Sequence, residues 1–300
     1  MTAPTAPLDE TAGTAGATGA AAAAGPGIGA DGRRRSQLYW VFADARSVAW
    51  RNLLRYVRLP QLIVFSTIQP IMFVLLFRYV FGGAIDTGPI PYVDYLMPGI
   101  FLQTALFGGV STGINLADDA NTGLLERFRS LPMARSAVLT GRTLADLVRN
   151  VLVVILMVVV GYLVGFRFHG NVTESALVIV LVTLFAYAFS WLTANVGLRA
   201  STPEAAQAAI LPIIFPLVFA SSAFVPTATM PGWLQAFAEH QPVTVVIDAC
   251  RQLVLGGQVD GNRYVPGIDW GDIGLSFAWI AGIAAVFAPL AVRAYRRKVT

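Results

Sequence analysis

The sequence has little charge, one cysteine and one lysine. Of its 300 residues only 13% are charged and 56% are hydrophobic, whereas a soluble domain carries about 25% charged residues. The single cysteine, Cys250, excludes an intramolecular disulfide and a cysteine-based metal site. The only lysine, Lys298, stands almost at the C-terminus, so the chain has no P-loop lysine and cannot bind ATP by that route. These absences exclude an ATPase of that type and leave a membrane protein.

Catalytic and ion-coupling groups are also scarce. The two histidines, His169 and His240, are far apart and neither belongs to a His-Glu-x-x-His helix, which argues against zinc hydrolase chemistry. No nucleophile and base occur at a usable spacing, so no catalytic residue is assigned. No carboxylate is central to an apolar block, because Asp118, Asp119, Asp146, Glu204 and Asp272 all fall at block ends. Ion-coupled transporters place ionisable groups within their spans, so the lack of central carboxylates disfavours a secondary transporter or channel for small solutes, which is kept as the alternative. A membrane scaffold without transport also stays open.

Six apolar blocks are present, and each is long enough to cross a bilayer, which takes roughly 20 residues. They predict an all-α polytopic membrane protein with six transmembrane helices, at 61–81, 95–117, 138–164, 176–198, 203–224 and 272–295. When the basic residues are sorted by the loops between these blocks, 17 of 21 fall on one side. The positive-inside rule then predicts that both termini are cytoplasmic. No basic run is interleaved with aromatics, so nucleic acid is not an expected partner.

The region before the first block has two parts. Residues 1–36 are rich in Ala, Gly, Thr and Pro and predict a disordered cytoplasmic tail, followed by a permease domain at 37–300. At 39–59 an apolar face alternates with Arg51, Arg55 and Arg58, which predicts an amphipathic interfacial helix on membrane lipid. A solvated helix packed on a partner is the alternative.

Small and polar residues interrupt the apolar blocks. Gly109 and Gly113, and Gly161 and Gly165, have the spacing that lets helices approach closely, and packing within the chain is the expected use. Polar side chains within the blocks could line a substrate path or could bond to neighbouring helices. The residues predicted for a path are Gln69, Gln103, Thr104, Ser111, Asn115 and Asn195.

The segment 122–132 joins the second and third blocks and predicts a short amphipathic helix that ends at Pro132. Its apolar face consists of Leu124, Leu125, Phe128 and Leu131, and its polar flank of Glu126, Arg127 and Arg129. Such a helix could lie on the lipid surface or could dock into a groove of another protein.

The segment 231–255 is too polar to cross a membrane but carries a second amphipathic pattern, broken by prolines such as Pro242. It predicts two short helices that re-enter the membrane on the outer side, with a simple extracellular loop as the alternative. A charge near the bilayer centre costs roughly 3 kcal/mol, so its charged residues are expected to pair with one another, with helix ends or with water in a vestibule. Cys250 is expected to react slowly or partially with reagents applied from outside. The residues assigned to this segment are Trp233, Phe237, Glu239, His240, Pro242, Asp248 and Arg251.

Two runs, ERFRSLPMARSAVLTGR and SSAFVPTATMPGWLQAFAEHQPVTVVIDACR, resemble the drug-resistance (daunorubicin/doxorubicin) class of type-2 ATP-binding-cassette exporter permeases. The resemblance covers the chain from about residue 39 to its end. One departure is Cys250, where related chains commonly carry leucine.

This resemblance implies a non-enzymatic permease subunit of a bacterial plasma-membrane exporter for hydrophobic compounds such as a drug, antibiotic or lipid. It implies that 122–132 is the helix that couples to the ATPase and that the outer segment is re-entrant. The implied partners are two copies of an ATPase subunit, which hold the ATP and Mg, and a second permease, either identical or a paralogue. No cofactor or metal is expected in this chain itself.

Overall fold

The computed structural model describes residues 60–122, 135–260 and 263–299. The chain divides into two compact units, Met1–Ser36 and Gln37–Thr300, and the described residues all belong to the second. The predicted tail (1–36), the predicted interfacial helix (39–59) and all of the predicted coupling helix after Thr122 lie outside the described residues.

Helices joined by loops make up the described chain, and its one sheet is a short two-stranded hairpin, so the all-α prediction is confirmed for these ranges. The two strands of the hairpin pair antiparallel, with Gly257 opposite Pro266. In chain order the elements are α2 Pro60–Leu76, the π-helix η1 Phe77–Phe81, α3 Tyr92–Asn121, α5 Arg135–Val164, α6 Val172–Arg199, α7 Pro203–Phe219, the 3-10 helix η2 Thr227–Thr229, α8 Gly232–His240, α9 Pro242–Leu255, β1 Gly257–Asp260, β2 Arg263–Pro266 and α10 Trp270–Val299.

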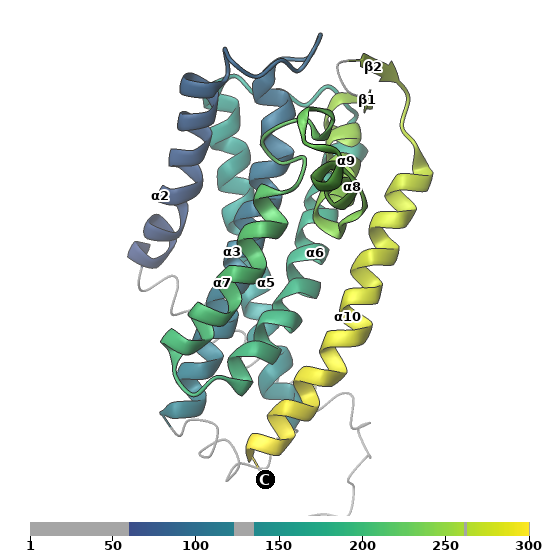
Figure 1. Cartoon of the computed structure of the whole chain (residues 1–300). Helices are drawn as coiled ribbons and strands as arrows, with labels where there is room; N and C mark the ends of the chain where they lie inside the picture. Colours follow the sequence, from purple (N-terminus) through teal and green to yellow (C-terminus); the bar gives the residue numbers. More distant parts are fainter. Residues whose placement is uncertain (1–59, 123–134, 261–262, 300) are drawn as a thin grey trace, which may run out of the picture. The chain divides into compact units, whose positions relative to one another are not determined.

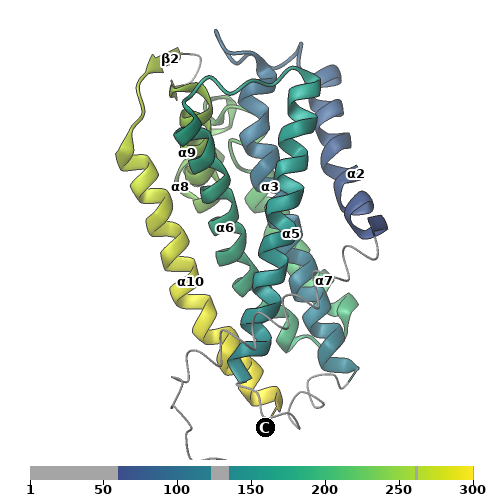
Figure 2. The ribbon, with the colours of Figure 1, turned by 180° about the vertical axis from the view of Figure 1, so that it is seen from behind.

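The helix α3 lies at the centre of the bundle. It packs against α2, α5, α6, α7 and α9, and α10 packs mainly against α6. Views from opposite sides place α2 and α10 on opposite flanks, with α8, α9 and the hairpin at the end of the bundle away from the C-terminus (Figures 1 and 2). We call the end with α8 and α9 the outer end and the end with the C-terminus the inner end.

Local signals in the sequence explain several helix ends. The α6 helix begins where the Glu174 carboxylate accepts a hydrogen bond of 2.7 Å from the Asn171 backbone N–H, one half of a capping box. At the start of α7 the Thr202 hydroxyl accepts from the Ala205 N–H at 3.1 Å, and a proline follows the cap directly. The α9 helix stops at Gly256, whose φ of +69° favours glycine.

Four described helices are long and apolar enough to cross a membrane: Tyr92–Asn121, Asp146–Val164, Val172–Arg199 and Trp270–Tyr295. Two further apolar helices, Thr67–Phe81 and Pro203–Phe219, are shorter. Four of the six predicted spans are thus candidate membrane-spanning helices by length and composition, and the six-span arrangement stays a prediction.

The fifth predicted span, 203–224, is longer than the helix found there. The α7 helix ends at Phe219 and contains Pro212 and Pro216, each of which removes a backbone donor. The residues beyond it bond elsewhere, since the Ala220 carbonyl accepts from the Gln241 amide at 2.6 Å. Bonds from the outer helices thus replace the last turn that periodicity predicted.

The crossing of α3 and α6 depends on glycine. A Cβ built on Gly197 would collide with the carbonyl oxygen of Gly113, and one built on Gly113 would lie 2.6 Å from the Thr193 carbonyl oxygen. The Thr193 hydroxyl donates to the Gly109 carbonyl across the same crossing at 2.7 Å. The predicted use of Gly109 and Gly113 in packing within the chain is confirmed.

We expect Gly197→Ala to lower the free energy of unfolding by about 1–3 kcal/mol, because the new methyl group must push two backbones apart. Thermal unfolding of the purified protein in detergent measures this. Gly282→Ala on α10 is the matched control, because a Cβ there meets nothing within 4 Å. Equal stability of the two variants would contradict the close crossing.

Candidate functional site

A cavity of about 390 Å³ lies among α2, α3, α5 and α7. We call it the polar cavity, because amide, hydroxyl and guanidinium groups project from otherwise apolar helices. Its lining residues are Gln69, Pro70, Gln103, Thr104, Phe107, Gly108, Val110, Ser111, Ile114, Arg149, Asn150, Val153, Gln207, Leu211 and Phe215.

The helix α3 supplies one wall of this cavity. Gln103, Phe107 and Ser111 recur every four residues and so lie on one face, with Thr104 and Gly108 one position further round. The Phe107 ring meets the Phe215 ring of α7 edge to face, with ring centroids 5.8 Å apart. The same wall therefore offers aromatic surface and hydrogen-bonding groups to one occupant.

The α5 helix approaches this wall at Gly108. A Cβ at Gly108 would collide with the Asn150 side-chain oxygen, so a larger residue there would force the Asn150 side chain to turn away. The Arg149 guanidinium lies beside Gly108, and its Nη2 donates to the Gly108 carbonyl at 2.7 Å. The Thr112 hydroxyl donates to the Asp146 carboxylate at 2.6 Å. These two bonds hold α3 and α5 together beside the cavity.

Two polar groups of the wall have no hydrogen-bond partner in the described part of the chain. They are the Gln103 side-chain oxygen and the Thr104 hydroxyl, on residues with exposed fractions of 3% and 6%. Leaving a buried polar group unsatisfied costs about 1–3 kcal/mol. Water or a ligand in the cavity can supply the missing partners.

The structure brings together four of the six residues predicted for a substrate path. Gln69, Gln103, Thr104 and Ser111 line the polar cavity, although they come from α2 and α3. Asn115 and Asn195 do not line it. Asn195 is buried within α6, and a polar residue inside an apolar block does not by itself reveal which face of its helix it occupies.

Sequence reasoning missed Arg149, Asn150 and Gln207 as lining residues. Arg149 was sorted with the loop arginines that set the topology, but it lies inside α5 and is buried. Its position inside the third apolar block, with Leu147 and Val148 just before it and VLVV just after Asn150, was the available signal. The predicted coupling residues Leu124, Leu125, Glu126, Arg127, Phe128, Arg129 and Leu131 lie outside the described residues.

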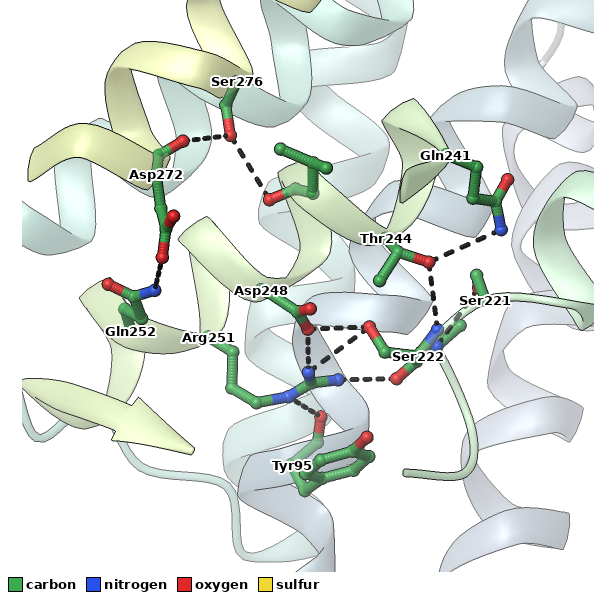
Figure 3. Close-up of polar contacts among 12 residues, drawn as sticks. Tyr95, Ser221, Ser222, Gln241, Thr244, Asp248, Arg251, Gln252, Asp272 and Ser276 are labelled. Carbon is green, nitrogen blue, oxygen red and sulfur yellow. Dashed lines mark hydrogen bonds and ion pairs between the residues drawn. The ribbon is translucent and has the colours of Figure 1, made fainter. Parts of the chain in front are cut away.

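At the outer end a buried arginine joins three segments (Figure 3). Arg251 of α9 is 3% exposed, and its guanidinium forms an ion pair with Asp248. It also donates to the Tyr95 carbonyl at 3.2 Å and to the Ser222 carbonyl at 2.7 Å, and lies 3.7 Å from the centroid of the Tyr95 ring. The predicted pairing of Asp248 with Arg251 is confirmed, and the pair links α9 to α3 and to the chain after α7.

The outer helices α8 and α9 differ in how they are buried. Val243, Val246 and Ile247 of α9 belong to the main core. On α8, Trp233 is 77% exposed and Phe237 is 49% exposed, so this apolar face does not pack on the described chain, and the re-entry of the helix into the membrane stays a prediction. The helix is only nine residues long and offers its aromatics outward, to lipid or to another molecule.

Three residues predicted for the outer segment have local roles. The Glu239 carboxylate accepts from the Gln235 amide at 2.7 Å, and His240 Nδ1 lies 2.9 Å from the Ala236 carbonyl oxygen. Pro242 starts α9. Glu239 thus bonds within its own helix at the surface, and it does not join the Arg251 pair.

A bundle of long apolar helices around a polar cavity is the architecture of a multi-pass membrane permease. The family model for the ABC-2 type transporter matches residues 44–255, more than half of the chain. The chain belongs to the ABC-2 type transporter family, and the resemblance inferred from its sequence is confirmed.

Several relatives are similar over most of their length. The daunorubicin resistance ABC transporter permease protein DrrB1 of Streptomyces coeruleorubidus is 33% identical over 249 residues, 83% of this chain and 84% of the relative. The probable doxorubicin resistance ABC transporter permease protein DrrC of Mycobacterium tuberculosis is 30% identical, covering 83% of this chain and 87% of the relative. A putative transport permease, ycf38, of Porphyra purpurea is 27% identical over 79% and 82%.

The only cysteine, Cys250, can report on whether the contacts of Arg251 at the outer end are intact. Cys250 is fully buried beside Arg251, and burial raises the pKa of its thiol to about 12, so almost no thiolate exists at pH 7.5. In place of slow labelling, we therefore expect no measurable labelling of Cys250 in the intact protein by a membrane-impermeant maleimide. Arg251→Ala should make Cys250 reactive, because it removes the hydrogen bonds that join α9 to the carbonyls of Tyr95 and Ser222, and leaving a buried polar group unsatisfied costs about 1–3 kcal/mol.

The matched control for this labelling experiment is Arg167→Ala in the loop between α5 and α6, which removes an exposed arginine that donates to the carbonyls of Tyr162 and Phe166 and not to Asp248. Mass spectrometry after labelling gives the modified fraction. Rapid labelling of the unsubstituted protein would show that the outer end opens without loss of the arginine.

Proposed function

We propose that this chain is the membrane-spanning subunit of an ATP-driven exporter of amphipathic, largely hydrophobic compounds, powered by a separate ATPase. The observation that carries the proposal is the polar cavity. Its volume of about 390 Å³ falls within the roughly 300–1,000 Å³ typical of small-molecule sites. The names of the relatives, which are permeases for daunorubicin or doxorubicin resistance, support the export of a drug-like or lipid-like molecule.

The cavity lining suits a molecule with both aromatic surface and polar substituents. Phe107 and Phe215 provide the aromatic surface, and the Gln103 oxygen and the Thr104 hydroxyl provide hydrogen-bonding groups without partners in the described chain. A purely hydrocarbon occupant would leave both groups unsatisfied. This favours compounds with hydroxyl or amine donors on an apolar scaffold.

The connection between α3 and α5 supports coupling to an ATPase. The predicted coupling segment 122–132 joins the end of α3 to the start of α5, and these two helices supply Gln103, Thr104, Arg149 and Asn150 to the cavity. A force applied by a partner to this segment would therefore reach the cavity wall through continuous helices. The proposed partners are two ATPase copies that hold ATP and Mg, and a second permease.

The exposed faces of α2 and α7 support pairing with a second permease. Met72 and Tyr79 of the first apolar segment and Phe215 and Phe219 of α7 are exposed, and both helices border the polar cavity. A second copy on this side would close the cavity between two chains. The proposed topology places six helices across the bacterial plasma membrane with both termini in the cytoplasm.

Gln103→Leu should weaken transport by up to about tenfold in apparent affinity, because one neutral hydrogen bond to the ligand contributes about 0.5–1.5 kcal/mol. Efflux of a fluorescent anthracycline from vesicles that contain the chain and its ATPase measures this. Gln258→Leu, in the hairpin away from the cavity, should transport normally. Equal transport by the two variants would contradict the role of the polar cavity in substrate binding.

The energy source is tested separately: efflux that continues after ATP depletion at a clamped ion gradient would favour a secondary transporter.

The purified chain alone should show no ATPase activity, because it has no P-loop lysine.

Phe128→Ala should uncouple transport from ATP hydrolysis while leaving membrane insertion intact. Truncating a central aromatic of an interface can cost over about 2 kcal/mol. Charge reversal at Glu126 is expected to act in the same way. Co-purification with the ATPase and vesicle transport are the two measurements, with Phe237→Ala as the aromatic control at the outer end. Normal co-purification and transport by Phe128→Ala would refute the coupling role of this segment.

A further inference from the structure

A second cavity, of about 360 Å³, lies between the C-terminal ends of α6 and α10, the inner end in Figures 1 and 2. We call it the basic pocket. It is lined by Leu198, Arg199, Leu290, Arg293, Ala294, Arg297 and Lys298. It is separate from the polar cavity, because the two share no lining residue.

Positive charge converges on this pocket without a balancing carboxylate. Four of its seven lining residues are basic and none is acidic. In the described ranges none of the four forms an ion pair, and their one hydrogen bond there is from the Lys298 ammonium to the Ala200 carbonyl, at 3.1 Å. Cations at helix C-termini complement the helix dipole, but four on one concave site repel one another unless an anion binds among them.

The pocket also has an apolar floor held in a fixed position. Leu198, Leu290 and Ala294 line it between the charges. Directly beside it, Ala291 and Tyr295 of α10 pack on Trp191 of α6 in a small core of their own. The walls of the pocket are therefore set by side-chain packing, and the charged groups surround an apolar surface at a defined spacing.

The neighbouring surface of α10 is suited to lipid chains. Only 17% of the apolar window of α10 is buried inside the protein, and Val286 and Trp279 along the helix are exposed. A molecule with its anionic group in the basic pocket would lay its apolar part along this surface. A free inorganic anion would use the charges but not the apolar floor.

We propose that the basic pocket binds the headgroup of an anionic phospholipid, with its phosphate among Arg199, Arg293 and Arg297 and its acyl chains along α10. Basic pockets between transmembrane helices bind such headgroups through phosphate contacts. Arginine suits this role because its planar fork donates two parallel hydrogen bonds to phosphate oxygens. This site is distinct from the proposed transport path and concerns a resident lipid.

The test uses the purified full-length chain in detergent, titrated with phosphatidylglycerol, phosphatidylcholine or inorganic phosphate. Native mass spectrometry counts bound lipid, and thermal unfolding measures protection. We expect the unsubstituted protein to retain phosphatidylglycerol at least about tenfold better than phosphatidylcholine. The double variant Arg293→Gln/Arg297→Gln should lose that preference, since each basic residue contributes to attraction of anionic lipid. Arg293→Lys/Arg297→Lys, which keeps the charge, is the matched control and should retain most of it.

The outcomes separate the alternatives. Equal retention of the two lipids, or unchanged phosphatidylglycerol binding by the glutamine variant, overturns the proposal. Protection by inorganic phosphate equal to that by phosphatidylglycerol overturns the lipid assignment in favour of a free anion. Loss of ATPase co-purification with unchanged lipid binding reassigns the pocket to a protein partner. Because lipid binding is read without ATP or substrate, failure here leaves the proposed transport function untouched, and the reverse also holds.

Discussion

The rest of the bundle depends on the contact between α3 and α6 at Gly113 and Gly197. The two helices cross so closely that a methyl group on either glycine would meet backbone of the other helix. This crossing fixes α3 at the centre, and α2, α5, α7 and α9 then pack around it. In a membrane, lipid tails are as apolar as leucine, so close packing has to supply the association energy that the hydrophobic effect supplies in water.

Two buried arginines at different depths of this bundle are stabilised in the same way, by hydrogen bonds to backbone carbonyl groups. Arg149 donates to the Gly108 carbonyl, and Arg251 donates to the carbonyls of Tyr95 and Ser222. A buried charge is expensive unless it is paired and hydrogen-bonded. Both arginines therefore bond to backbone of α3 or its neighbours, and each fastens one peripheral helix to the central one: α5 through Arg149 and α9 through Arg251.

Much of the fold was predictable because apolar runs and helix signals are local properties of a sequence. The pairing of Asp248 with Arg251 was also predictable, since the two lie three residues apart on one helix face. The lining of the polar cavity was only partly predictable, because the residues that line it are decided by which helix faces pack against each other. Arg149 lies well inside the predicted block 138–164, but it counted as a topology signal because arginines beside apolar segments normally are one. Asn115 was predicted to line the path, and it is not among the residues that line the cavity.

The distribution of proline gives the polar cavity one stiff wall and one pliable wall. The α3 and α5 segments that line it contain no proline and are tied by the bonds of Arg149 and Asp146. The opposite side contains Pro70 in α2, and α7 carries Pro212 and Pro216, where missing backbone hydrogen bonds make a helix easier to bend. Any change in the volume of the cavity is therefore expected to come from bending of α2 and α7, while α3 and α5 move together as one rigid unit.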